Sequence, residues 1–374
     1  MSLEASIKER ARGLGFDLVG ITTASPFPEA DAAYQRWIDA GHHGTMAYMA
    51  EHRDRVGDPR RVRASARSII AVAMNYYAGE PVPPVDDEPR GRLARYAWGD
   101  DYHLVMWPRL RTLCGFLTEH GARLARYYVD TGPLLDRAIA QRAGLGWCGR
   151  HSCLITKAFG TWVTLGEILT DLDLRPDPPA SGDCGLCEAC LRGDEACPTG
   201  AITAPGVVDA RKCISYWTIE YRGWIPREIR PTLQDMIFGC DLCQEACPHN
   251  RLAKPTAHLE FHPRPDVGTH PRLLPLLNIS EVDYRRRFRR SPLKRAKRSG
   301  LRRNVAVALG NLRDPRAVAG LAEALHDPDD AVVRGHAAWA LGRIGGEAAR
   351  AALNDAAGVE RDAQVLEEIR SALR

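Results

Sequence analysis

The chain has 374 residues, which is enough for two or three domains at roughly 150 residues each. Its composition, 45% hydrophobic and 26% charged, is typical of a globular protein, and no apolar run approaches the roughly 20 residues that span a bilayer. The net charge of +4 is too small to indicate a partner. At the N-terminus, residues 1–13 predict an amphipathic helix without the apolar core of a signal peptide, so we expect a cytoplasmic protein.

Residues 1–175 alternate patterns that are typical of strands and helices, which favours an α/β or α+β domain. The centre of Ser68–Asn75 is apolar throughout, as expected of a strand that is buried on both faces. Residues 79–92 are rich in proline, glycine and charge and predict a loop. Strands are predicted over 16–22, 68–75, 123–129 and 162–169, and a helix is predicted over 104–120, ending at Gly121.

Asp130 is the candidate catalytic acid of this first domain. It follows the strand predicted over 123–129 and precedes Thr-Gly-Pro, and α/β proteins keep their sites at the carboxyl ends of strands. Asp136 is the nearby rival. For both residues the structural alternative is a helix cap or a turn, because aspartate is common in each.

Eight of the eleven cysteines lie between Cys184 and Cys247. In a reducing cytosol such clustering indicates metal more often than disulfides. The cysteines form two runs that each end in Cys-Pro, and in two-cluster ferredoxins the last cysteine of each run ligates the other cluster. This rule assigns one [4Fe–4S] cluster to Cys184, Cys187, Cys190 and Cys247, and a second to Cys197, Cys213, Cys240 and Cys243.

This assignment departs from the compact ferredoxin pattern in two places. Six residues rather than three separate Cys190 from Cys197, and Cys213 lies 27 residues before Cys240. Structural zinc is the alternative, because pairs of Cys-x-x-Cys also hold zinc. Zinc does not require the Cys-Pro-Thr-Gly-Ala-Ile element at 197–202, so we favour a ferredoxin-like module.

A basic segment follows the cysteines. From Arg285 to Arg303, eleven of nineteen residues are arginine or lysine and none is acidic. Like charges repel one another, so we expect a polyanion here, and nucleic acid is the first candidate. An anionic membrane is less favoured, because no large apolar face accompanies the charge, and a solvated face is the structural alternative. The predicted nucleic-acid contacts are Lys294, Arg295, Lys297, Arg298, Arg302 and Arg303.

The last part of the chain contains a repeated motif. Ala-Leu-Gly-Asn-Leu at 308–312 recurs as Ala-Leu-Gly-Arg-Ile at 340–344, a spacing of 32 residues. Each copy belongs to an alanine-rich helical stretch, and Asp-Pro turns fall between the helices. The pattern predicts HEAT-like helical repeats stacked as a small solenoid. An ordinary helical bundle remains open, because two copies are few.

Several motifs together resemble the epoxyqueuosine reductases, over residues from about 10 to 374. The motifs lie at Arg95–His103, Val129–Pro133, Ala143–Trp147, Leu165–Ile168, Cys213–Glu220, Phe238–Gln244 and Ser291–Arg295. The resemblance implies a cobalamin-dependent oxidoreductase that removes the epoxide oxygen of epoxyqueuosine in the tRNA anticodon wobble position, giving queuosine. It also implies that two [4Fe–4S] clusters feed the corrinoid, and that HEAT-like repeats with basic residues help to hold the tRNA.

The resemblance assigns roles to individual residues. It implies that Asp130 is the proton donor, whereas Arg55 matches the family only loosely, because its spacing to Pro59 differs. The implied corrinoid contacts are Arg55, Tyr96, Asp130, Ser152, Leu154 and Ile155. The expected domains are a cobalamin-binding catalytic domain (1–175), a ferredoxin-like domain (176–255), a basic connecting segment (256–299) and a tRNA-binding repeat domain (300–374). We expect a monomer served by an unidentified electron donor, without membrane attachment.

Two other functions compete with this interpretation. A related corrinoid reductase, such as a reductive dehalogenase, explains the clusters but leaves the basic segment and the repeats without a purpose. A non-enzymatic ferredoxin module bound to RNA leaves the large first domain without a purpose. Corrinoid content would exclude the second alternative, and turnover of epoxyqueuosine in tRNA would decide against the first.

Overall fold

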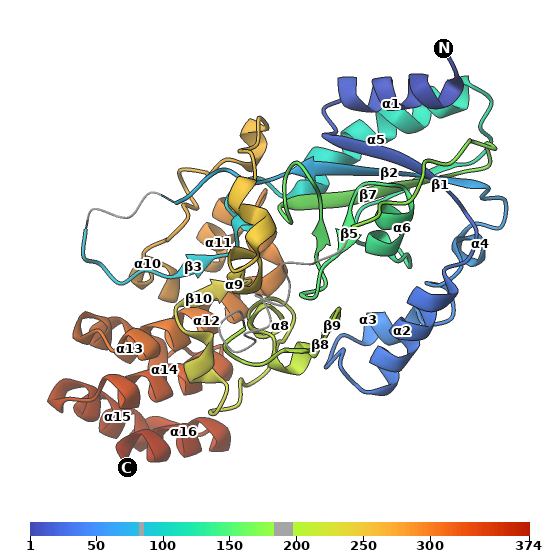
Figure 1. Ribbon diagram of the computed structural model, residues 1–374. Coiled ribbons are helices and arrows are strands. Elements are labelled where there is room, and N and C mark those ends of the chain that lie inside the picture. Colours follow the sequence, from blue (N-terminus) through green and yellow to red (C-terminus); the bar gives the residue numbers. More distant parts are fainter. Residues whose placement is uncertain (82–85, 183–196) are drawn as a thin grey trace. The chain divides into compact units, whose positions relative to one another are not determined.

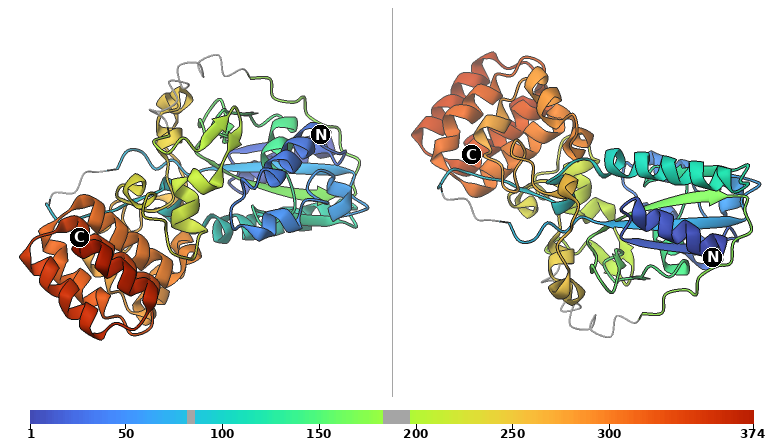
Figure 2. Two further views of the ribbon diagram at one scale, coloured as in Figure 1. Left: turned by 90° about the horizontal axis from the view of Figure 1, so that it is seen from below. Right: turned by 90° about the horizontal axis from the view of Figure 1, so that it is seen from above.

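The computed structural model describes residues 1–81, 86–182 and 197–374 (Figures 1 and 2). Contacts group the chain into two compact units. The first unit comprises residues 1–79, 100–212 and 241–262, and the second comprises residues 80–99, 213–240 and 263–374. The described part of the cysteine segment is divided between them. The domain boundaries expected at 175, 255 and 299 separate sequence motifs, and they remain predictions.

The first unit is built on a four-stranded sheet with the strand order β1-β2-β7-β4. All three neighbouring pairs are antiparallel, and all eight residues of β2 are buried. The strands are β1 (Leu18–Thr23), β2 (Ser68–Asn75), β4 (Ala125–Tyr128) and β7 (Val163–Thr170). The sequence predicted all four to within about two residues. Their antiparallel order belongs to the α+β class, because α/β folds alternate helices with parallel strands.

Helices cover both faces of this sheet. Figure 1 shows α1 (Leu3–Gly13) and α5 (Tyr102–Glu119) on one face and α6 (Asp136–Arg142) on the other. Ile7 and Ala11 of α1 are fully buried, which confirms the amphipathic helix expected there. The other helices of the unit are α2 (Pro28–Asp39), α3 (Ala47–Glu51), α4 (Pro59–Val62), α9 (Leu242–Glu245), η2 (Ala210–Lys212), η4 (Pro248–Leu252) and η5 (Leu259–Phe261).

Two small hairpins complete the first unit. Strands β5 (Trp147–Cys148) and β6 (Leu154–Ile155) pair with each other, as do β8 (Ile202–Ala204) and β9 (Val207–Val208). The β8–β9 hairpin is joined to the end of α2, where the Trp37 indole donates to the Val208 carbonyl at 2.7 Å. Among the described residues of the chain, no helix is both long and apolar enough to cross a bilayer.

The second unit contains the predicted repeats. Its repeat helices are α12 (Lys297–Leu312), α13 (Val318–Leu325), α14 (Ala331–Ile344), α15 (Glu347–Val359) and α16 (Ala363–Leu373). The two copies of the repeated motif lie in α12 and α14, which pack together. Their contact is close at Gly310, where a Cβ atom would lie 2.7 Å from the Trp339 ring. The 32-residue spacing therefore reports two equivalent helices in a stack.

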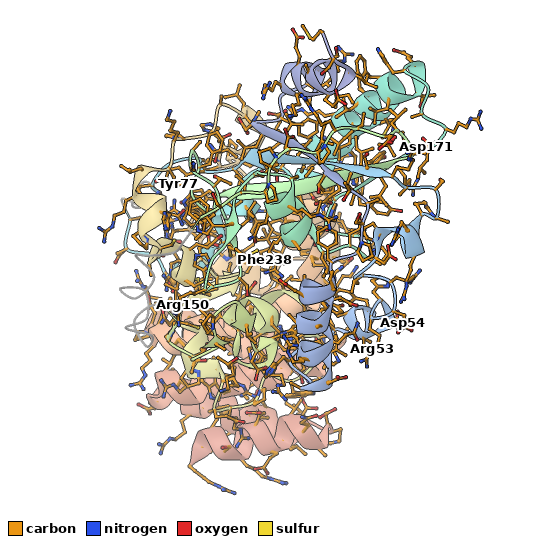
Figure 3. All side chains as sticks on the ribbon, turned by 45° about the vertical axis from the view of Figure 1, so that its right-hand side comes forward. Arg53, Asp54, Tyr77, Arg150, Asp171 and Phe238 are labelled. Carbon is orange, nitrogen blue, oxygen red and sulfur yellow. The ribbon has the colours of Figure 1, made fainter. Side chains whose placement is uncertain are left out.

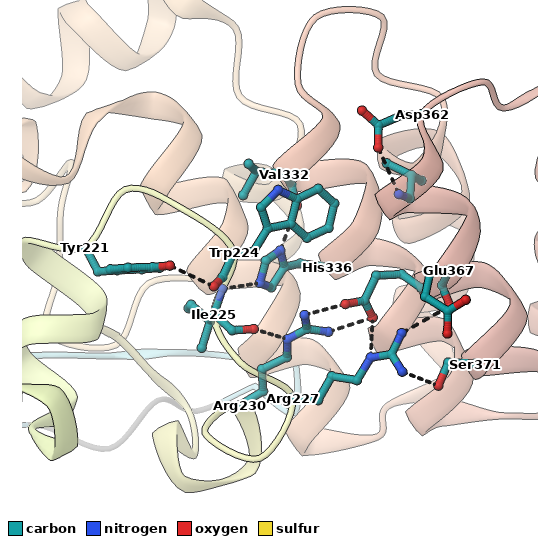
Figure 4. Close-up of polar contacts among 12 residues, drawn as sticks. Tyr221, Trp224, Ile225, Arg227, Arg230, Val332, His336, Asp362, Glu367 and Ser371 are labelled. Carbon is teal, nitrogen blue, oxygen red and sulfur yellow. Dashed lines mark hydrogen bonds and ion pairs between the residues drawn. The ribbon is translucent and has the colours of Figure 1, made fainter. Parts of the chain in front are cut away.

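A segment before the repeats anchors them within the same unit. Arg230 donates to both carboxylate oxygens of Glu368, at 2.9 and 2.6 Å, and Arg227 donates to the same carboxylate at 3.1 Å (Figure 4). The backbone N–H of Ile225 donates to Nε2 of the buried His336 at 3.2 Å. Burial lowers the pKa of His336 well below its ordinary value, so this imidazole is neutral and can accept.

The remaining elements of the second unit are short. Strand β3 (Arg92–Leu93) pairs in parallel with β10 (Met236–Phe238). The helices are η1 (Arg95–Ala97), α8 (Ile214–Ile219), η3 (Arg230–Leu233), α10 (Leu274–Leu277), α11 (Glu281–Phe288), η6 (Pro292–Ala296) and η7 (Pro315–Ala317). The basic segment thus runs through α11, η6 and the first turns of α12.

Candidate active site

Asp130 lies two residues beyond the end of β4, and its side chain is exposed. Its backbone is left-handed, with φ at +59°. This conformation costs a non-glycine residue of order 1–3 kcal/mol, and such strain is common at active sites. The predicted position at a strand end is correct, but the strand is the antiparallel edge of its sheet. The α/β rule that motivated the prediction therefore does not apply.

A cluster of polar residues at the start of α5 holds Asp130. The Tyr102 hydroxyl donates to Oδ2 of Asp130. The Tyr102 ring stacks on the His103 ring, with centroids 4.2 Å apart, and Nδ1 of His103 lies 2.8 Å from Oδ1 of Asp101. Asp101 is buried and caps α5 by accepting from the His103 N–H. The sequence marked this Asp-Tyr-His motif, but it gave no sign that Tyr102 would contact Asp130.

Two further carboxyl groups lie close to Asp130. Asp136 begins α6 without capping it, since the N-cap is Leu135. Burial raises the pKa of Asp136 to about 7, the nearby Asp130 charge adds to the rise, and Arg137 opposes it. Burial also raises the pKa of Glu167 on β7 well above its ordinary value, with Asp136 and Asp130 adding to the effect. Both groups therefore retain protons that an exposed carboxyl would have lost.

The loop between β5 and β6 was expected to contact a corrinoid. Ser152 has a left-handed backbone, with φ at +67°, and its hydroxyl donates to the Gly206 carbonyl at 2.6 Å. The Arg137 guanidinium donates to the Ser152 carbonyl. Leu154 and Ile155 are 3% and 0% exposed, because their side chains pack in the core. At these two positions only the backbone remains for a cofactor to meet, and the expected contact stays a prediction.

The other two expected corrinoid contacts are not joined to Asp130 by the described contacts. Arg55 is exposed, and its guanidinium lies 3.2 Å from Nδ1 of His52. Figure 3 shows its neighbours Arg53 and Asp54 at one edge of the molecule, away from Arg150. Tyr96 belongs to the second unit, where its ring lies 6.1 Å from the Phe238 ring.

Five of the eight predicted cluster cysteines lie among the described residues, and the surroundings of two of them, Cys197 and Cys247, suit thiolate ligands. Sγ of Cys197 accepts from the Ala201 N–H at 3.4 Å and lies 3.4 Å from the Thr199 hydroxyl. Hydrogen bonds to sulfur are one of the features that tune iron–sulfur clusters. Cys247 is 1% exposed and packs against Trp147 and Ile155, so its sulfur has an apolar surrounding.

The division of the cysteines into two sets remains a prediction. Cys184, Cys187 and Cys190 lie outside the described residues. The other members are Cys213 at the start of α8, Cys240 after β10, Cys243 in α9, Cys197 and Cys247. In the part of the chain that the structure describes, no three His, Cys, Asp or Glu side chains converge as they would around a single metal ion.

The basic segment is divided into exposed and buried parts. Lys294, Arg295 and Lys297 are exposed. Arg295 pairs with the Glu220 carboxylate at 2.8 Å, and the half-buried Arg298 donates to the Ile279 carbonyl at 2.7 Å. The first turns of the segment also have acidic neighbours, since Arg285 and Arg286 pair with Glu281 and Asp283 in the same helix. The positive charges are thus partly neutralised.

The structure corrects the expectation for Arg302 and Arg303. They are 2% and 1% exposed, so neither can reach a phosphate in this fold. Arg303 donates to the carbonyls of Trp217, Tyr221 and Gly223 at 2.7 to 2.9 Å. Arg302 donates to the Leu277 carbonyl and to the Asp327 carboxylate. Both residues hold α12 in place. Their partners are distant in sequence, so the charge run alone could not reveal this role.

Comparisons with known families agree with this arrangement. Residues 57–131 match the family described as "Epoxyqueuosine reductase QueG, DUF1730". Residues 183–250 match "4Fe-4S double cluster binding domain", and residues 292–374 match "HEAT repeats". The catalytic candidate Asp130, the cysteines and the repeat helices each fall within one of these matches.

Individual relatives extend the likeness over almost the whole chain. The epoxyqueuosine reductase of Xanthomonas campestris is 40% identical over 347 residues, which cover 91% of this chain and 96% of the relative. That of Synechocystis is 44% identical over 296 residues, covering 78% of this chain and 100% of the relative. A crystal structure of epoxyqueuosine reductase with an epoxyqueuosine-modified tRNA-Tyr stem loop is 33% identical, with a TM-score of 0.92 over 99% of this chain and 98% of that chain.

Proposed function

This chain belongs to the epoxyqueuosine reductase family, whose members convert epoxyqueuosine in the tRNA anticodon to queuosine, and we propose that Asp130 is its proton donor, with cobalamin bound beside it. The enzyme is an oxidoreductase with a double [4Fe–4S] module. The two alternatives weighed from the sequence are not favoured, because the relatives named epoxyqueuosine reductase match nearly the full length. We further propose a cytoplasmic monomer that takes electrons from an unidentified electron donor.

The arrangement around Asp130 carries the acid assignment. Loss of the epoxide oxygen breaks both C–O bonds, forms a C=C bond and releases water, which consumes two electrons and two protons. An epoxide oxygen leaves poorly unless it is protonated, and a positioned acid typically contributes about 10²–10⁴-fold. Asp130 is exposed at the surface, accepts a hydrogen bond from the Tyr102 hydroxyl, and lies near two carboxyls that retain protons.

The residues near the β5–β6 loop fit a large polar cofactor. Nε1 of Trp147 and Nε of Arg150 are buried without a hydrogen-bond partner among the described residues. Buried donors are normally satisfied, so these two suit a bound polar group. The backbone of Ser152, Leu154 and Ile155 and the side chain of Asp130 would hold cobalamin. When bound, it supplies a strongly reducing, nucleophilic cobalt centre.

Three exposed basic residues and the half-buried Arg298 would hold the RNA. We propose that Lys294, Arg295, Lys297 and Arg298 contact phosphates of the tRNA, since guanidinium and ammonium groups on a surface neutralise phosphate charge. Arg295 already pairs with Glu220, so it would exchange this partner for a phosphate or share it. Arg302 and Arg303 are omitted because they are buried.

The test is anaerobic reconstitution. Protein purified without oxygen should contain about eight iron per chain as two cubanes. With added cobalamin and a chemical reductant, it should convert an epoxyqueuosine-containing anticodon stem loop to the queuosine form, measured by mass spectrometry of the released nucleosides. Omitting cobalamin should abolish conversion. Conversion at an undiminished rate by corrinoid-free protein would overturn the cofactor assignment, and absence of conversion by fully loaded protein would overturn the proposed substrate.

A further inference from the structure

The segment after Cys247 leads from a predicted cluster ligand to the surface of the first unit. Cys247 is 1% exposed and packs against the Trp147 ring, and η4 begins at the next residue. Leu252, the last residue of η4, is 87% exposed, more than any other large hydrophobic residue of the described chain except Met1. A buried ligand and an exposed apolar side chain are therefore only five residues apart.

The side chain of Asn250 fixes η4 to its surroundings. Its Oδ1 accepts from the Thr161 N–H at 2.7 Å, and its Nδ2 donates to the Thr161 hydroxyl at 2.8 Å and to the Gln244 carbonyl at 2.7 Å. Gly160 has a left-handed backbone, with φ at +57°, and a Cβ atom there would lie 2.0 Å from Oδ1 of Asn250. The loop at 156–160 is thus held tightly against η4, and this part of the surface is preformed.

Three exposed cations lie on η4, on the residues after it and on the 156–160 loop. They are Arg251, Lys254 and Lys157. Their side chains have no ion-pair partner among the described residues. The backbone at Lys254 is held in place, because Nδ2 of Asn75 donates to its carbonyl at 2.8 Å. The described acid nearest to them in sequence is Glu245, so positive charge prevails here.

This combination suits an acidic protein that carries electrons. A single exposed leucine is ordinary on a protein surface. Here it stands among unpaired cations and close to a cluster ligand, where an electron can enter over a short distance. Contacts between redox proteins are small, below about 1,200 Å², and unpaired surface charges steer a partner of opposite sign. RNA would use the cations but would gain nothing from the leucine.

We propose that Lys157, Arg251, Leu252 and Lys254, here called the η4 surface, form the docking site of a small acidic electron-carrier protein. The inference rests on the proposed function, because that reaction consumes electrons, and on Cys247 as a cluster ligand. In each encounter the reduced carrier loses one electron and one [4Fe–4S] cluster gains it, and no bond forms or breaks. Two encounters supply the two electrons of one turnover.

The test mixes the cluster-loaded protein with a reduced flavodoxin, and separately with a reduced two-cluster ferredoxin, and follows oxidation of the carrier by stopped flow. Replacing the three cations together, as Lys157→Gln, Arg251→Gln and Lys254→Gln, should slow the second-order rate per cluster about 10-fold at low salt and flatten its salt dependence. Leu252→Ser should slow the reaction at high salt as well, where charges are screened. Both changes should weaken binding of the oxidised carrier, measured by biolayer interferometry.

A matched control removes the same charge from the far end of the sheet. It combines Arg123→Gln, Arg126→Gln and Arg175→Gln, three exposed arginines. Arg123 and Arg126 lie where Ala125 pairs with Thr170, and Arg175 follows that end of β7, whereas Asn75 pairs with Val163 at the other end. This control should bind and oxidise both carriers as the wild type does.

The inference would be overturned by equal rates in the two triple variants or by an unchanged rate in Leu252→Ser. It would also be overturned if neither carrier reduced wild-type clusters that a chemical reductant reduces. A loss of stem-loop affinity as large as the loss of carrier affinity would assign the cations to RNA and equally overturn it. With saturating chemical reductant, every variant should convert the stem loop at the wild-type rate. Absence of conversion by the loaded wild type under that condition would instead overturn the proposed function.

Discussion

The second unit pairs the buried charges of Arg230 and Glu368, whereas the first unit contains a buried acid, Glu167, that has no counter-charge among the described residues. In the second unit Arg230 binds both oxygens of Glu368, and Arg303 binds three backbone carbonyls. In the first unit Glu167 is fully buried, and its carboxyl oxygens have no hydrogen-bond partner among the described residues. The charged groups that act on it are two other carboxyls, Asp136 and Asp130, which raise its pKa further. The paired charges hold segments of the second unit together, whereas the unpaired acid of the first unit keeps its proton.

The difference has a clear energetic meaning. A buried pair contributes little net stability, but removing one partner leaves an uncompensated charge and costs about 3–5 kcal/mol. An unpaired buried acid lowers stability as long as it is present. Natural proteins accept such local violations chiefly at functional sites. Substitutions in the first unit should therefore change chemistry, and substitutions at the pairs of the second unit should change folding.

The largest effect is expected at Asp130. Asn keeps the shape and hydrogen-bonding capacity of Asp130 but has no acidic proton, so Asp130→Asn should slow conversion of the modified stem loop by about 10²–10⁴-fold. Iron content, unfolding temperature and stem-loop affinity should remain those of the wild type. Asp173→Asn is the matched control, because Asp173 is an exposed aspartate that pairs with Arg67 in the same unit. Near-normal turnover by Asp130→Asn would place the acid elsewhere.

The next largest effect concerns the stability of the second unit. Glu368→Ala leaves Arg230 buried without its carboxylate and should lower the free energy of unfolding by about 3–5 kcal/mol. Denaturant unfolding followed by circular dichroism measures this change. Glu281→Ala breaks an exposed pair with Arg285 and should cost about 0.5 kcal/mol or less. If both substitutions cost the same, burial does not distinguish the two pairs.

A smaller effect is expected in the pH dependence of stability. The folded-state pKa of Asp136 is raised from 3.8 to about 7, so between these values the folded chain binds more protons than the unfolded chain. The contribution of Asp136 to the free energy of unfolding is therefore fully present below pH 3.8, and it is lost as the pH rises through about 7. Because Asp136 is only partly buried, the decline should be on the order of 1 kcal/mol.

The comparison that measures this decline uses Asp136→Asn, which cannot ionise. The unfolding temperature of the wild type should be lower at pH 8 than at pH 6, and the difference should shrink in the variant. Glu167 acts in the same direction, so some decline should remain. A wild-type stability that rises over this interval would contradict the raised pKa of Asp136.

Most elements of the fold could be predicted from patterns of neighbouring residues, whereas contacts between residues far apart in the sequence could not. The apolar run at Ser68–Asn75 and the 32-residue repeat depend on neighbours in sequence, and both interpretations held. The burial of Arg303 depends on carbonyls at 217–223, about eighty residues earlier, so a charge run looked exposed.

The same limit applies to the candidate active site. Asp130 could be found because a strand and a Thr-Gly-Pro turn flank it. Its Tyr102 partner comes from another helix, and the isolation of Glu167 depends on three strands and α6. A glutamate within an otherwise apolar strand pattern was the available signal for Glu167, because the flanking leucines mark that face as buried.

The smallest effect divides the basic segment itself. Lys294 and Lys297 are exposed, and each lysine that neutralises a phosphate contributes roughly −0.9 to the log–log salt slope on duplex nucleic acid and about −0.7 on single strands. Replacing both with Gln should flatten the slope for stem-loop binding by about 1.4 to 1.8 and leave folding unchanged.

Arg303→Gln is the matched contrast within the same run of charges. It removes bonds to three carbonyls, so it should destabilise the protein while molecules that remain folded keep the wild-type slope. Fluorescence anisotropy titrations at several salt concentrations measure both slopes. An unchanged slope in the lysine variant would make these residues a solvated face, and a flattened slope in folded Arg303→Gln would show that the buried arginine also contributes to RNA binding.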